Sequence, residues 1–362
     1  MITKYTEDLC LVVTERCNLN CVYCQSDKSF KGIMNWECAR RNLDRFLSTS
    51  EAATPSVTFM GGEPFLAFKL IEELVAYAET SYPEKSINYT IVTNGTLVHG
   101  DIQKWIHKHQ SNVQVVLSLD GIGENHDLNR CKSLKMIDLN FFRSLKKPIV
   151  NTVFTPQTIG QLADTTILLH QYGFLVKGFF ADGEPWEDQH TGVIAEQLMR
   201  LISFYLAHPD TAPISLLCQP LFYLTSEKPV RRCGTEKFEE VSVSADGTLW
   251  ACHRCSPFEN HGTWKIPEKY LGLTNACHLL DECDSCFLEK ICNACPASNA
   301  AIMDDKEQSQ TMCGIRKLLF KANAYLALSM LSSENDYKAL RFLSDEKKRH
   351  LVESAIMIMD KL

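Results

Sequence analysis

The stretch Thr14-Glu-Arg-Cys-Asn-Leu-Asn-Cys-Val-Tyr-Cys24 places three cysteines, Cys17, Cys21 and Cys24, directly behind the first apolar run of the chain. Three thiolates at this spacing can hold three irons of one [4Fe–4S] cluster and leave the fourth iron open to a small molecule. The apolar run over residues 8–14 predicts a short buried strand. The triplet is then expected in the loop at the carboxyl end of that strand, where α/β barrels place their chemistry.

A structural zinc knuckle is the alternative for the triplet, and it needs a fourth ligand close by. The next cysteine is Cys38, which falls in a predicted helix over residues 35–48. The chain holds 16 cysteines in 362 residues, its first residues are polar, and no apolar run reaches the length of a membrane span. We therefore expect a cytoplasmic protein without disulfides, whose cysteines bind metal.

A second motif follows another predicted strand, residues 56–60, which runs into Gly61-Gly62-Glu63-Pro64. Glycines permit close backbone approach, and Glu63 offers an acceptor for an ammonium group. The cysteine triplet followed by this GGEP sequence resembles the radical SAM enzymes. The resemblance implies that the four residues of the motif contact SAM, with glycine backbone and the Glu63 carboxylate meeting the amino group of its methionine part.

Later strand ends match further parts of the radical SAM signature. Predicted strands over residues 89–93 and 115–118 end at polar residues that resemble the ribose-side positions of the family. Arg130 resembles the arginine that pairs with the SAM carboxylate, a bidentate task that suits a guanidinium. The alternative makes these residues ordinary turn residues and a solvated charge. The remaining SAM contacts that the resemblance implies are Tyr23, Thr93, Asn94, Ser118 and Asp120.

Ten further cysteines lie between positions 218 and 313. Seven of them resemble the SPASM domain of radical SAM proteins, which carries two auxiliary [4Fe–4S] clusters. One spacing departs from the family, because two residues rather than three precede Cys295. The resemblance implies these ligands for the first auxiliary cluster: Cys233, Cys252 and Cys295, with Cys218, Cys255 or an open iron in the fourth place. It implies these for the second: Cys283, Cys286, Cys292 and Cys313.

A zinc ribbon over residues 283–295 competes for the same region, although two C-x2-C pairs separated by five residues are short for a ribbon. Residues 240–252 alternate and turn at Asp246-Gly247, which predicts a hairpin that brings Cys233 and Cys252 together. The cysteines expected to be buried apolar residues rather than ligands are Cys10, Cys38, Cys131 and Cys277.

Residues 1–207 alternate predicted strands and helices, the pattern of an α/β fold with a parallel sheet. The predicted strands centre on Leu11, Thr58, Ile91, Val116, Asn151 and Phe179. Six strands match the partial (β/α)6 TIM-type barrel of radical SAM proteins. We expect a bridging helix over residues 191–207 and the SPASM domain over residues 208–314. Residues 315–362 are expected to form a C-terminal helical segment, which is helical from Arg316 onward and has Ser344 as an N-cap.

The net charge of −7 is mild, and the basic run over residues 347–349 is most simply a solvated helix face. Neither nucleic acid nor a membrane is therefore an expected partner. The resemblance implies two other partners, a peptide or protein substrate and an external one-electron donor of the flavodoxin or ferredoxin type.

The resemblance also implies the chemistry. A reduced cluster at the triplet would split SAM, and the resulting 5′-deoxyadenosyl radical would take hydrogen from an unactivated carbon. SPASM relatives mostly act on peptides and proteins, so we expect a maturase that installs an oxidative modification, a thioether or carbon–carbon crosslink, in a ribosomally made peptide. The alternatives are formylglycine formation on a protein Cys or Ser and peptide epimerisation. A non-enzymatic electron carrier would leave the GGEP motif unexplained.

One residue helps to choose among these reactions. Sulfatase maturases carry an aspartate directly after the cysteine that corresponds to Cys252, and it is taken as the base for the substrate proton. This chain has His253 there, which resembles the peptide-crosslinking maturases. Histidine titrates near neutrality and can also act as a base, and a plain hydrogen bond near the cluster is the alternative role.

Overall fold

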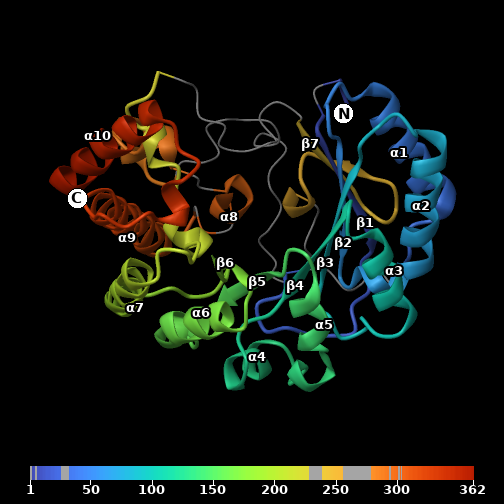
Figure 1. The fold of residues 1–362 in the computed structure, drawn as a ribbon, viewed down its shortest axis with the longest axis horizontal. Coiled ribbons are helices and arrows are strands. Elements are labelled where there is room, and N and C mark those ends of the chain that lie inside the picture. The colour runs from blue at the N-terminus through green and yellow to red at the C-terminus, as the bar shows by residue number, and fades with distance from the viewer. Residues whose placement is uncertain are drawn as a thin grey trace. The chain divides into compact units, whose positions relative to one another are not determined.

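A computed structural model describes the chain except for residues 1, 5, 26–31, 228–238, 256–278, 293–294, 301 and 303. The chain divides into two compact units (Figure 1). The first unit comprises Met1–Leu119, His126–Val150 and Cys233–Asn275. The second comprises Asp120–Asn125, Asn151–Arg232 and Ala276–Leu362.

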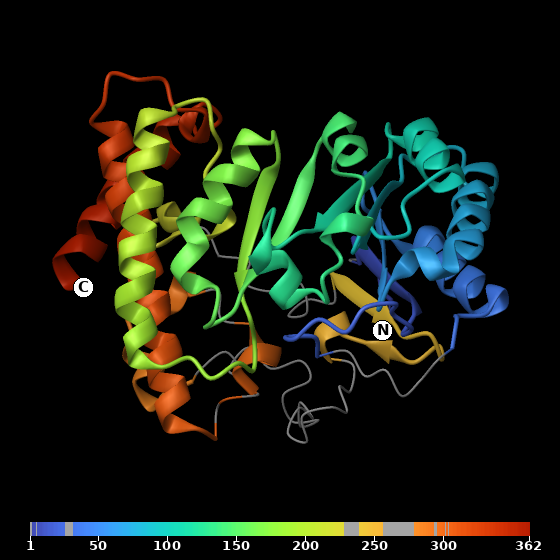
Figure 2. The same ribbon diagram turned by 90° about the horizontal axis from the view of Figure 1, so that it is seen from below.

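Four parallel strands form the centre of the first unit, in the order β4-β3-β2-β1. Their bounds are β1 Asp8–Thr14, β2 Ser56–Gly61, β3 Asn88–Thr93 and β4 Val113–Ser118. The helices that connect them are α1 Trp36–Thr49, α2 Phe68–Ser81 and α3 Asp101–His109. These helices lie together on one side of the strands (Figures 1 and 2). The carboxyl ends of the strands therefore share one edge of the sheet.

The local sequence explains these elements. Leu9 and Leu11 of β1 are fully buried, and Cys10 between them is buried too. Burial of consecutive residues is expected of a parallel strand that is covered on both faces. Helix α1 begins where the Asn35 side chain accepts the backbone N–H of Cys38 across 2.8 Å, which satisfies one of the open donors of the first turn.

A hairpin extends the sheet of the first unit beyond β1. Strand β7 (Glu240–Val243) pairs in parallel with β1 and antiparallel with β8 (Leu249–Trp250). At the turn Gly247 adopts a φ of +92°, in the left-handed region that favours glycine. The predicted hairpin is therefore confirmed. Its pairing with β1 was not predicted, because an alternating pattern does not identify the neighbouring strand.

The second unit contains most of β5 (Ile149–Phe154) and all of β6 (Leu175–Phe180), which are neighbours. Its longer helices are α6 Leu162–Gln171, α7 Asp188–Ala207, α9 Lys306–Leu331 and α10 Asp345–Lys361. Helix α7 lies beside α9, as Figure 2 also shows. A buried apolar cluster joins α9 and α10 to the cysteine-rich segment; its residues are Leu221, Leu288, Ile291, Phe320, Ala324, Leu351, Ala355 and Ile358.

The other described helices are short. They are η1 Pro64–Ala67, α4 Glu124–Asn129, η2 Leu134–Met136, α5 Leu139–Ser144, η3 Ile159–Gln161, η4 Ser215–Leu217, η5 Leu221–Tyr223, η7 His253–Cys255, η11 Asp281–Ser285, η12 Glu289–Ile291, α8 Pro296–Ala300 and η13 Lys338–Leu340.

The α/β class and all six predicted strands are confirmed, and the two helices predicted over residues 35–48 and 191–207 are α1 and α7. The C-terminal helical segment begins at Lys306 rather than at Arg316. Its start is fixed by Asp305, whose side chain accepts the backbone N–H of Gln308 across 3.0 Å. The predicted N-cap of α10 is confirmed, since the Ser344 hydroxyl accepts the backbone N–H of Lys347.

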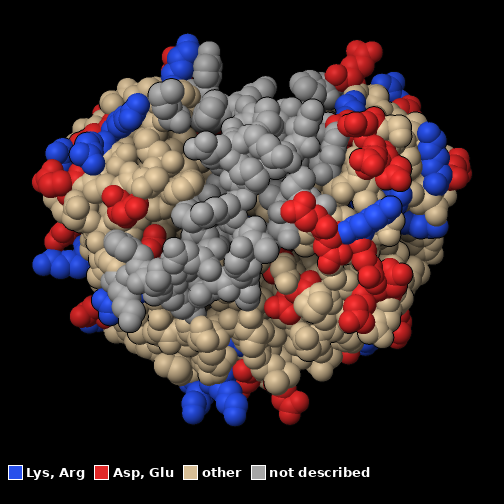
Figure 3. Space-filling view, turned by 180° about the vertical axis from the view of Figure 1, so that it is seen from behind, with Lys and Arg blue, Asp and Glu red and all other residues tan. Residues whose placement is uncertain are grey.

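Two surface observations bear on partners. None of the described helices combines the length and the apolar character that a membrane crossing needs. On the face shown in Figure 3, Asp and Glu side chains gather in a broad patch beside the undescribed residues, while Lys and Arg lie mostly at the margins. Within this patch the described surface therefore carries more negative than positive charge.

Candidate functional site

Close backbone contact joins the GGEP motif to the triplet loop in the first unit. The backbone N–H of Gly62 donates to the Thr14 carbonyl across 3.0 Å, and that of Glu63 donates to the Arg16 carbonyl across 2.8 Å. A Cβ on Gly61 would lie 1.8 Å from the Thr14 oxygen, and one on Gly62 would lie 2.3 Å from the Arg16 oxygen. Only glycine fits at these two positions, because any side chain would push the two strand ends apart.

Glu63 is fully buried and accepts three hydrogen bonds. Oε1 accepts the Thr93 hydroxyl across 2.7 Å and the Phe65 backbone N–H across 3.1 Å, and Oε2 accepts the Asn94 backbone N–H across 2.7 Å. Burial raises the pKa of the Glu63 carboxyl to about 7, although these bonds and the charge of Arg130 pull it down. The carboxylate thus joins the end of β2 to the end of β3 and keeps lone pairs for a further donor.

Asn94 connects the end of β3 to the triplet loop. Its side-chain amide donates to Asn18 Oδ1 across 2.9 Å and to the Cys17 sulfur across 3.9 Å. Asn18 in turn donates to the Thr96 hydroxyl, which donates to Asn94 Oδ1. The first cysteine of the triplet is therefore held by a closed ring of polar side chains.

Arg130 approaches the same loop from the end of α4. Its Nη1 donates to the Cys21 sulfur across 3.9 Å, and its guanidinium carbon lies 5.6 Å from the centre of the Tyr23 ring. The backbone N–H of Val22 donates to the Asn129 carbonyl across 3.0 Å. Only 7% of Arg130 is exposed, so its charge is largely withdrawn from water. The structure therefore places a buried cation beside the second cysteine.

Two of the other predicted SAM contacts lie at strand ends, and one lies elsewhere. Ser118 is the last residue of β4, and Pro64 is the first residue of η1 behind β2. Asp120 belongs to the second unit, where its Oδ1 accepts the backbone N–H of Val153 across 3.0 Å. That oxygen is therefore used to hold β5. In the first unit the structure brings Cys17, Glu63, Thr93 and Asn94 into one hydrogen-bonded group. It brings Cys21, Tyr23 and Arg130 into a second group on the same loop.

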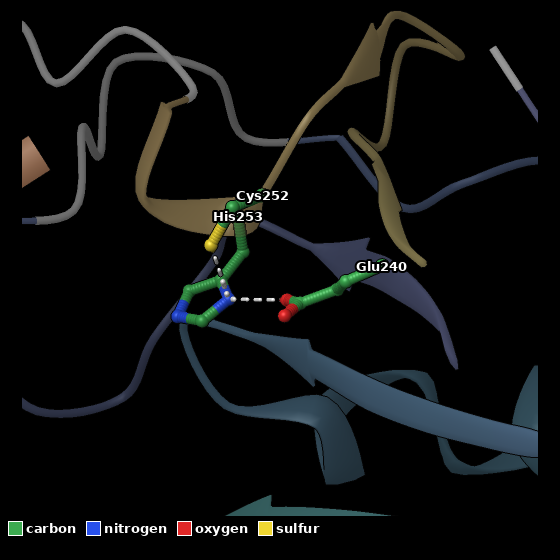
Figure 4. A group of neighbouring side chains, drawn as sticks. All are labelled: Glu240, Cys252 and His253. Atoms are coloured by element: carbon green, nitrogen blue, oxygen red, sulfur yellow. Dashed lines mark hydrogen bonds and ion pairs between the residues drawn. The ribbon is translucent and has the colours of Figure 1, made fainter. Parts of the chain in front are cut away.

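A second group in the first unit surrounds the predicted catalytic histidine (Figure 4). Nδ1 of His253 lies 3.8 Å from Glu240 Oε1 and 3.6 Å from the Cys252 sulfur. Ligand atoms of all three residues lie within 4.8 Å of one another, so the group has the donors of a metal site. Burial lowers the pKa of His253, but its hydrogen bonds to Cys252 and Glu240 outweigh this and raise it to about 9.

Four predicted cluster ligands of the second unit line one cavity of about 40 Å³. They are Cys283, Cys286, Cys292 and Cys313. Leu279, Leu288 and Phe320 form apolar parts of its wall, while Arg316 and Lys317 supply positive charge. Glu289 also lines the cavity. Four thiols that line one small, mostly apolar cavity match the donor set of a [4Fe–4S] cluster. Cys295 does not line this cavity, and its role as a ligand of the other auxiliary site stays a prediction.

The remaining cysteines divide between the two units. Cys252 belongs to the first unit and Cys295 to the second, and the Cys218 thiol donates to the Pro213 carbonyl across 3.3 Å. Cys233, Cys277 and the side chain of Cys255 lie outside the described residues. The hairpin contact predicted for Cys233 therefore stays a prediction.

The expectation of buried apolar cysteines holds for two of four. Cys10 and Cys38 are buried, and burial raises the pKa of the Cys10 thiol to about 12, so that it stays protonated. Cys131 is exposed, against expectation, because it sits in a turn with a φ of +56°. Its sulfur accepts the backbone N–H of Asn20 in the triplet loop across 3.3 Å.

Sequence reasoning missed three polar residues of these groups. Asn18 and Thr96 complete the ring around Asn94, and Glu240 pairs with His253. The only signal for Asn18 was its position directly after Cys17. Glu240 gave none, because it reads as the polar first residue of a strand.

Residues 11–138 match the Radical SAM superfamily. The matched segment contains the triplet, the GGEP motif and Arg130, so the chain carries a segment that matches this superfamily of enzymes. Members of this superfamily use a [4Fe–4S] cluster and SAM. The prediction of the superfamily from the sequence is therefore confirmed.

Curated relatives align with about a third of the chain. An uncharacterised protein of Methanocaldococcus jannaschii is 34% identical over 137 residues, which are 38% of this chain and 46% of that protein. The radical SAM cyclopropyl synthase TigE of Paramaledivibacter caminithermalis is 30% identical over 132 residues, 32% of this chain and 27% of that enzyme. The chain thus spans less than half the length of these relatives.

Solved structures match over more of the chain. The structure of histidine-tagged anSMEcpe with bound AdoMet has a TM-score of 0.72 at 20% identity and covers 95% of this chain and 98% of that chain. Streptococcus suis SuiB bound to the precursor peptide SuiA has a TM-score of 0.55 at 17% identity. This match covers 85% of this chain and 75% of that chain. These matches confirm the predicted fold, including the region that follows the barrel.

Proposed function

We propose that this protein is a radical SAM maturase that abstracts hydrogen from a ribosomally made peptide and installs an oxidative modification, a crosslink of the thioether or carbon–carbon type. The observation that carries the proposal is a pair of hydrogen-bonded groups on the triplet loop of the first unit: Glu63, Thr93 and Asn94 at Cys17, and Arg130 at Cys21. An electron carrier would need the thiols but not this arrangement of opposite charges beside them.

The residues present fit a cluster and SAM. Cys17, Cys21 and Cys24 would hold the cluster, whose open iron with SAM supplies a 5′-deoxyadenosyl radical when reduced. Glu63 offers a buried anion for the SAM ammonium, and Arg130 a buried cation for its carboxylate. Because both charges are already desolvated and held by neighbours, they orient SAM with little further cost of ordering.

The auxiliary sites are proposed in the same terms. The four-cysteine cavity of the second unit would hold one [4Fe–4S] cluster. Cys233, Cys252 and Cys295 would hold another, with Cys218, Cys255 or an open iron in the fourth place. The chain would then bind three clusters, one at the triplet and one at each of the two auxiliary sites.

A peptide substrate is supported by the relatives in fold. anSMEcpe was solved with bound AdoMet and a Cp18Cys peptide, at a TM-score of 0.69 to this chain, and SuiB with its precursor peptide SuiA. We propose proton transfer with the substrate for His253. Figure 4 shows its Nδ1 turned toward Glu240 and Cys252, so that only Nε2 faces away from both.

The test uses the full chain, reconstituted with iron and sulfide without oxygen, reduced, and mixed with SAM and the short peptides encoded beside its gene. We expect 5′-deoxyadenosine and a peptide lighter by two hydrogens that no aldehyde reagent labels. A hydrazide-reactive product would show formylglycine formation instead. An unchanged mass with solvent deuterium in the peptide would show epimerisation, and absence of 5′-deoxyadenosine would refute radical SAM chemistry.

A further inference from the structure

The four-cysteine cavity of the second unit has charged residues in its wall to which the proposed function gives no role. Helix α9 supplies Cys313, Arg316, Lys317 and Phe320 to this wall, at positions i, i+3, i+4 and i+7. Residues at these positions share one face of an α-helix. The same helix face therefore brings one thiol and two cations to the cavity.

Arg316 is held more firmly than Lys317. Its Nη2 donates to Asn299 Oδ1 across 2.6 Å, and Asn299 is 1% exposed. Arg316 itself is half-buried, whereas Lys317 is exposed. A guanidinium has five N–H donors, and the bond to Asn299 uses one of them. The guanidinium is thus fixed at the cavity that the four thiols line, and it has further donors beyond this bond.

The rest of the wall decides how strongly a charge acts there. Leu279, Leu288 and Phe320 are buried and apolar, so they keep water away from part of the cavity. A charge acts more strongly where water is excluded. Glu289 is the one carboxylate among the described residues of the wall, and it opposes the two cations.

These charges matter to an iron–sulfur cluster because its reduction by one electron adds one negative charge to the site. A fixed cation stabilises the reduced form more than the oxidised form and so raises the reduction potential, while a fixed anion lowers it. Net charge and hydrogen bonds to the sulfur atoms are among the factors that set the potential of such clusters. A half-buried arginine can supply both.

We propose that Arg316 raises the reduction potential of the [4Fe–4S] cluster that the four cysteines of this cavity would hold, and that Glu289 lowers it. Lys317 acts in the same direction as Arg316 but more weakly, because water and salt screen an exposed charge. This inference rests on the cluster proposed for the cavity and not on the reaction that the enzyme performs. The site takes up one electron more readily than it would without the arginine.

The test is a redox titration of the full chain, reconstituted with iron and sulfide without oxygen and followed by electron paramagnetic resonance. The signal of the four-cysteine site is the one that Cys313→Ala removes. Arg316→Gln should lower the equilibrium constant for reduction of that site by roughly tenfold, a shift of about 59 mV for one electron. Lys317→Gln should lower it by only about threefold. Glu289→Gln should raise it.

Two further variants separate the effect of charge from that of structure. Arg316→Lys keeps the charge and should keep the equilibrium constant within about threefold of the wild type. Lys306→Gln removes an exposed lysine at the start of α9, outside the described cavity wall, and should leave the potential unchanged. The iron content of each variant shows whether its clusters are retained. If Arg316→Gln loses iron, the opposite shifts expected of Lys317→Gln and Glu289→Gln decide the question.

The proposal fails if Arg316→Gln keeps its iron and the wild-type potential, or if Glu289→Gln lowers the potential as the cation variants do. It also fails if Lys306→Gln shifts the potential as much as Lys317→Gln. If Cys313→Ala removes neither iron nor a signal, the cavity holds no cluster, and this inference falls together with that auxiliary site. The chemistry proposed for the triplet would be unaffected by that result.

Discussion

The backbone N–H of Asn94 donates to the Glu63 carboxylate across 2.7 Å, while the side chain of Asn94 donates to the Cys17 sulfur across 3.9 Å. One residue therefore connects the GGEP motif to the first cysteine of the triplet. A change in the Glu63 carboxylate reaches the triplet loop through this residue as well as through the two backbone bonds to Thr14 and Arg16.

Glu63→Gln should weaken SAM binding and lower the free energy of unfolding together. The glutamine has only one oxygen to serve three buried donors, which costs about 1–3 kcal/mol, and it carries no charge for the SAM ammonium. Urea unfolding and equilibrium dialysis of SAM measure the two effects. Glu72→Gln, an exposed carboxylate of α2, is the control and should change neither. Full SAM affinity in Glu63→Gln would remove Glu63 from the site.

The pKa of Glu63 gives two pH dependences. Burial raises the pKa of Glu63 from its usual 4.5 to about 7, so between these two pH values the folded protein holds a proton that the unfolded chain has lost. The contribution of Glu63 to stability is therefore complete at acidic pH and is lost as pH rises through 7. SAM affinity has the opposite sign: it should fall below pH 7, since the ammonium needs the ionised carboxylate. SAM binding near neutral pH should therefore release a proton, which calorimetry in buffers of different ionisation heat detects. Binding without proton release would contradict the assignment.

Arg130→Ala should weaken SAM binding by roughly ten- to a hundredfold, the usual effect of losing a charged hydrogen bond at a desolvated site. Arg130→Lys should restore only part of the affinity, because an ammonium lacks the planar fork that pairs with a carboxylate. Arg45→Ala, an exposed arginine of α1, is the matched control for charge. Equal affinities in all three variants would place the carboxylate partner elsewhere.

The sequence predicted the strands well because each is a short apolar run that ends in a polar motif. Cys17 follows the end of β1 by three residues, Gly61 ends β2, and Asn94 directly follows β3; the chemistry of these residues is visible without a structure. The triplet and GGEP motif also came together as predicted, since parallel strands bring their carboxyl ends to one edge.

The sequence did not predict which polar side chains contact one another. The contact between Glu240 and His253 depends on β7 pairing with β1, which no local pattern encodes. Cys131 looked like a buried thiol by composition, yet its left-handed backbone places it in an exposed turn. The role of Asn18 is not predictable from the sequence, because a single polar residue between cysteines shows no periodic pattern.

Iron content can show which cysteines share a cluster. Full reconstitution should give about twelve irons per chain, and Cys313→Ala should lose about four. Adding Cys283→Ala to Cys313→Ala should lose no more, because both thiols line one cavity. Adding Cys295→Ala should lose about four more, since Cys295 does not line that cavity. Zinc in place of iron in the wild type would support a ribbon and contradict the cluster.

The last prediction concerns Cys252, which lies 3.6 Å from Nδ1 of His253 through its sulfur. When two substrate atoms are joined after hydrogen abstraction, the resulting radical holds one electron more than the closed-shell product. The protein must accept that electron. If Cys252 holds the auxiliary cluster that takes this electron, Cys252→Ala should still form 5′-deoxyadenosine but should lose most of the modified peptide. The His253→Ala enzyme should keep its iron. Its yield of modified peptide should fall only if His253 transfers the substrate proton.

The measurement is the ratio of modified peptide to 5′-deoxyadenosine, followed by mass spectrometry in each variant. Cys38→Ala, a buried cysteine that is not a proposed ligand, is the matched control and should keep the wild-type ratio. A Cys252→Ala enzyme that keeps this ratio would show that the electron leaves by another route. If His253→Ala lowered the ratio while Glu240→Gln left it unchanged, His253 would act without its carboxylate partner, and the pair would be structural.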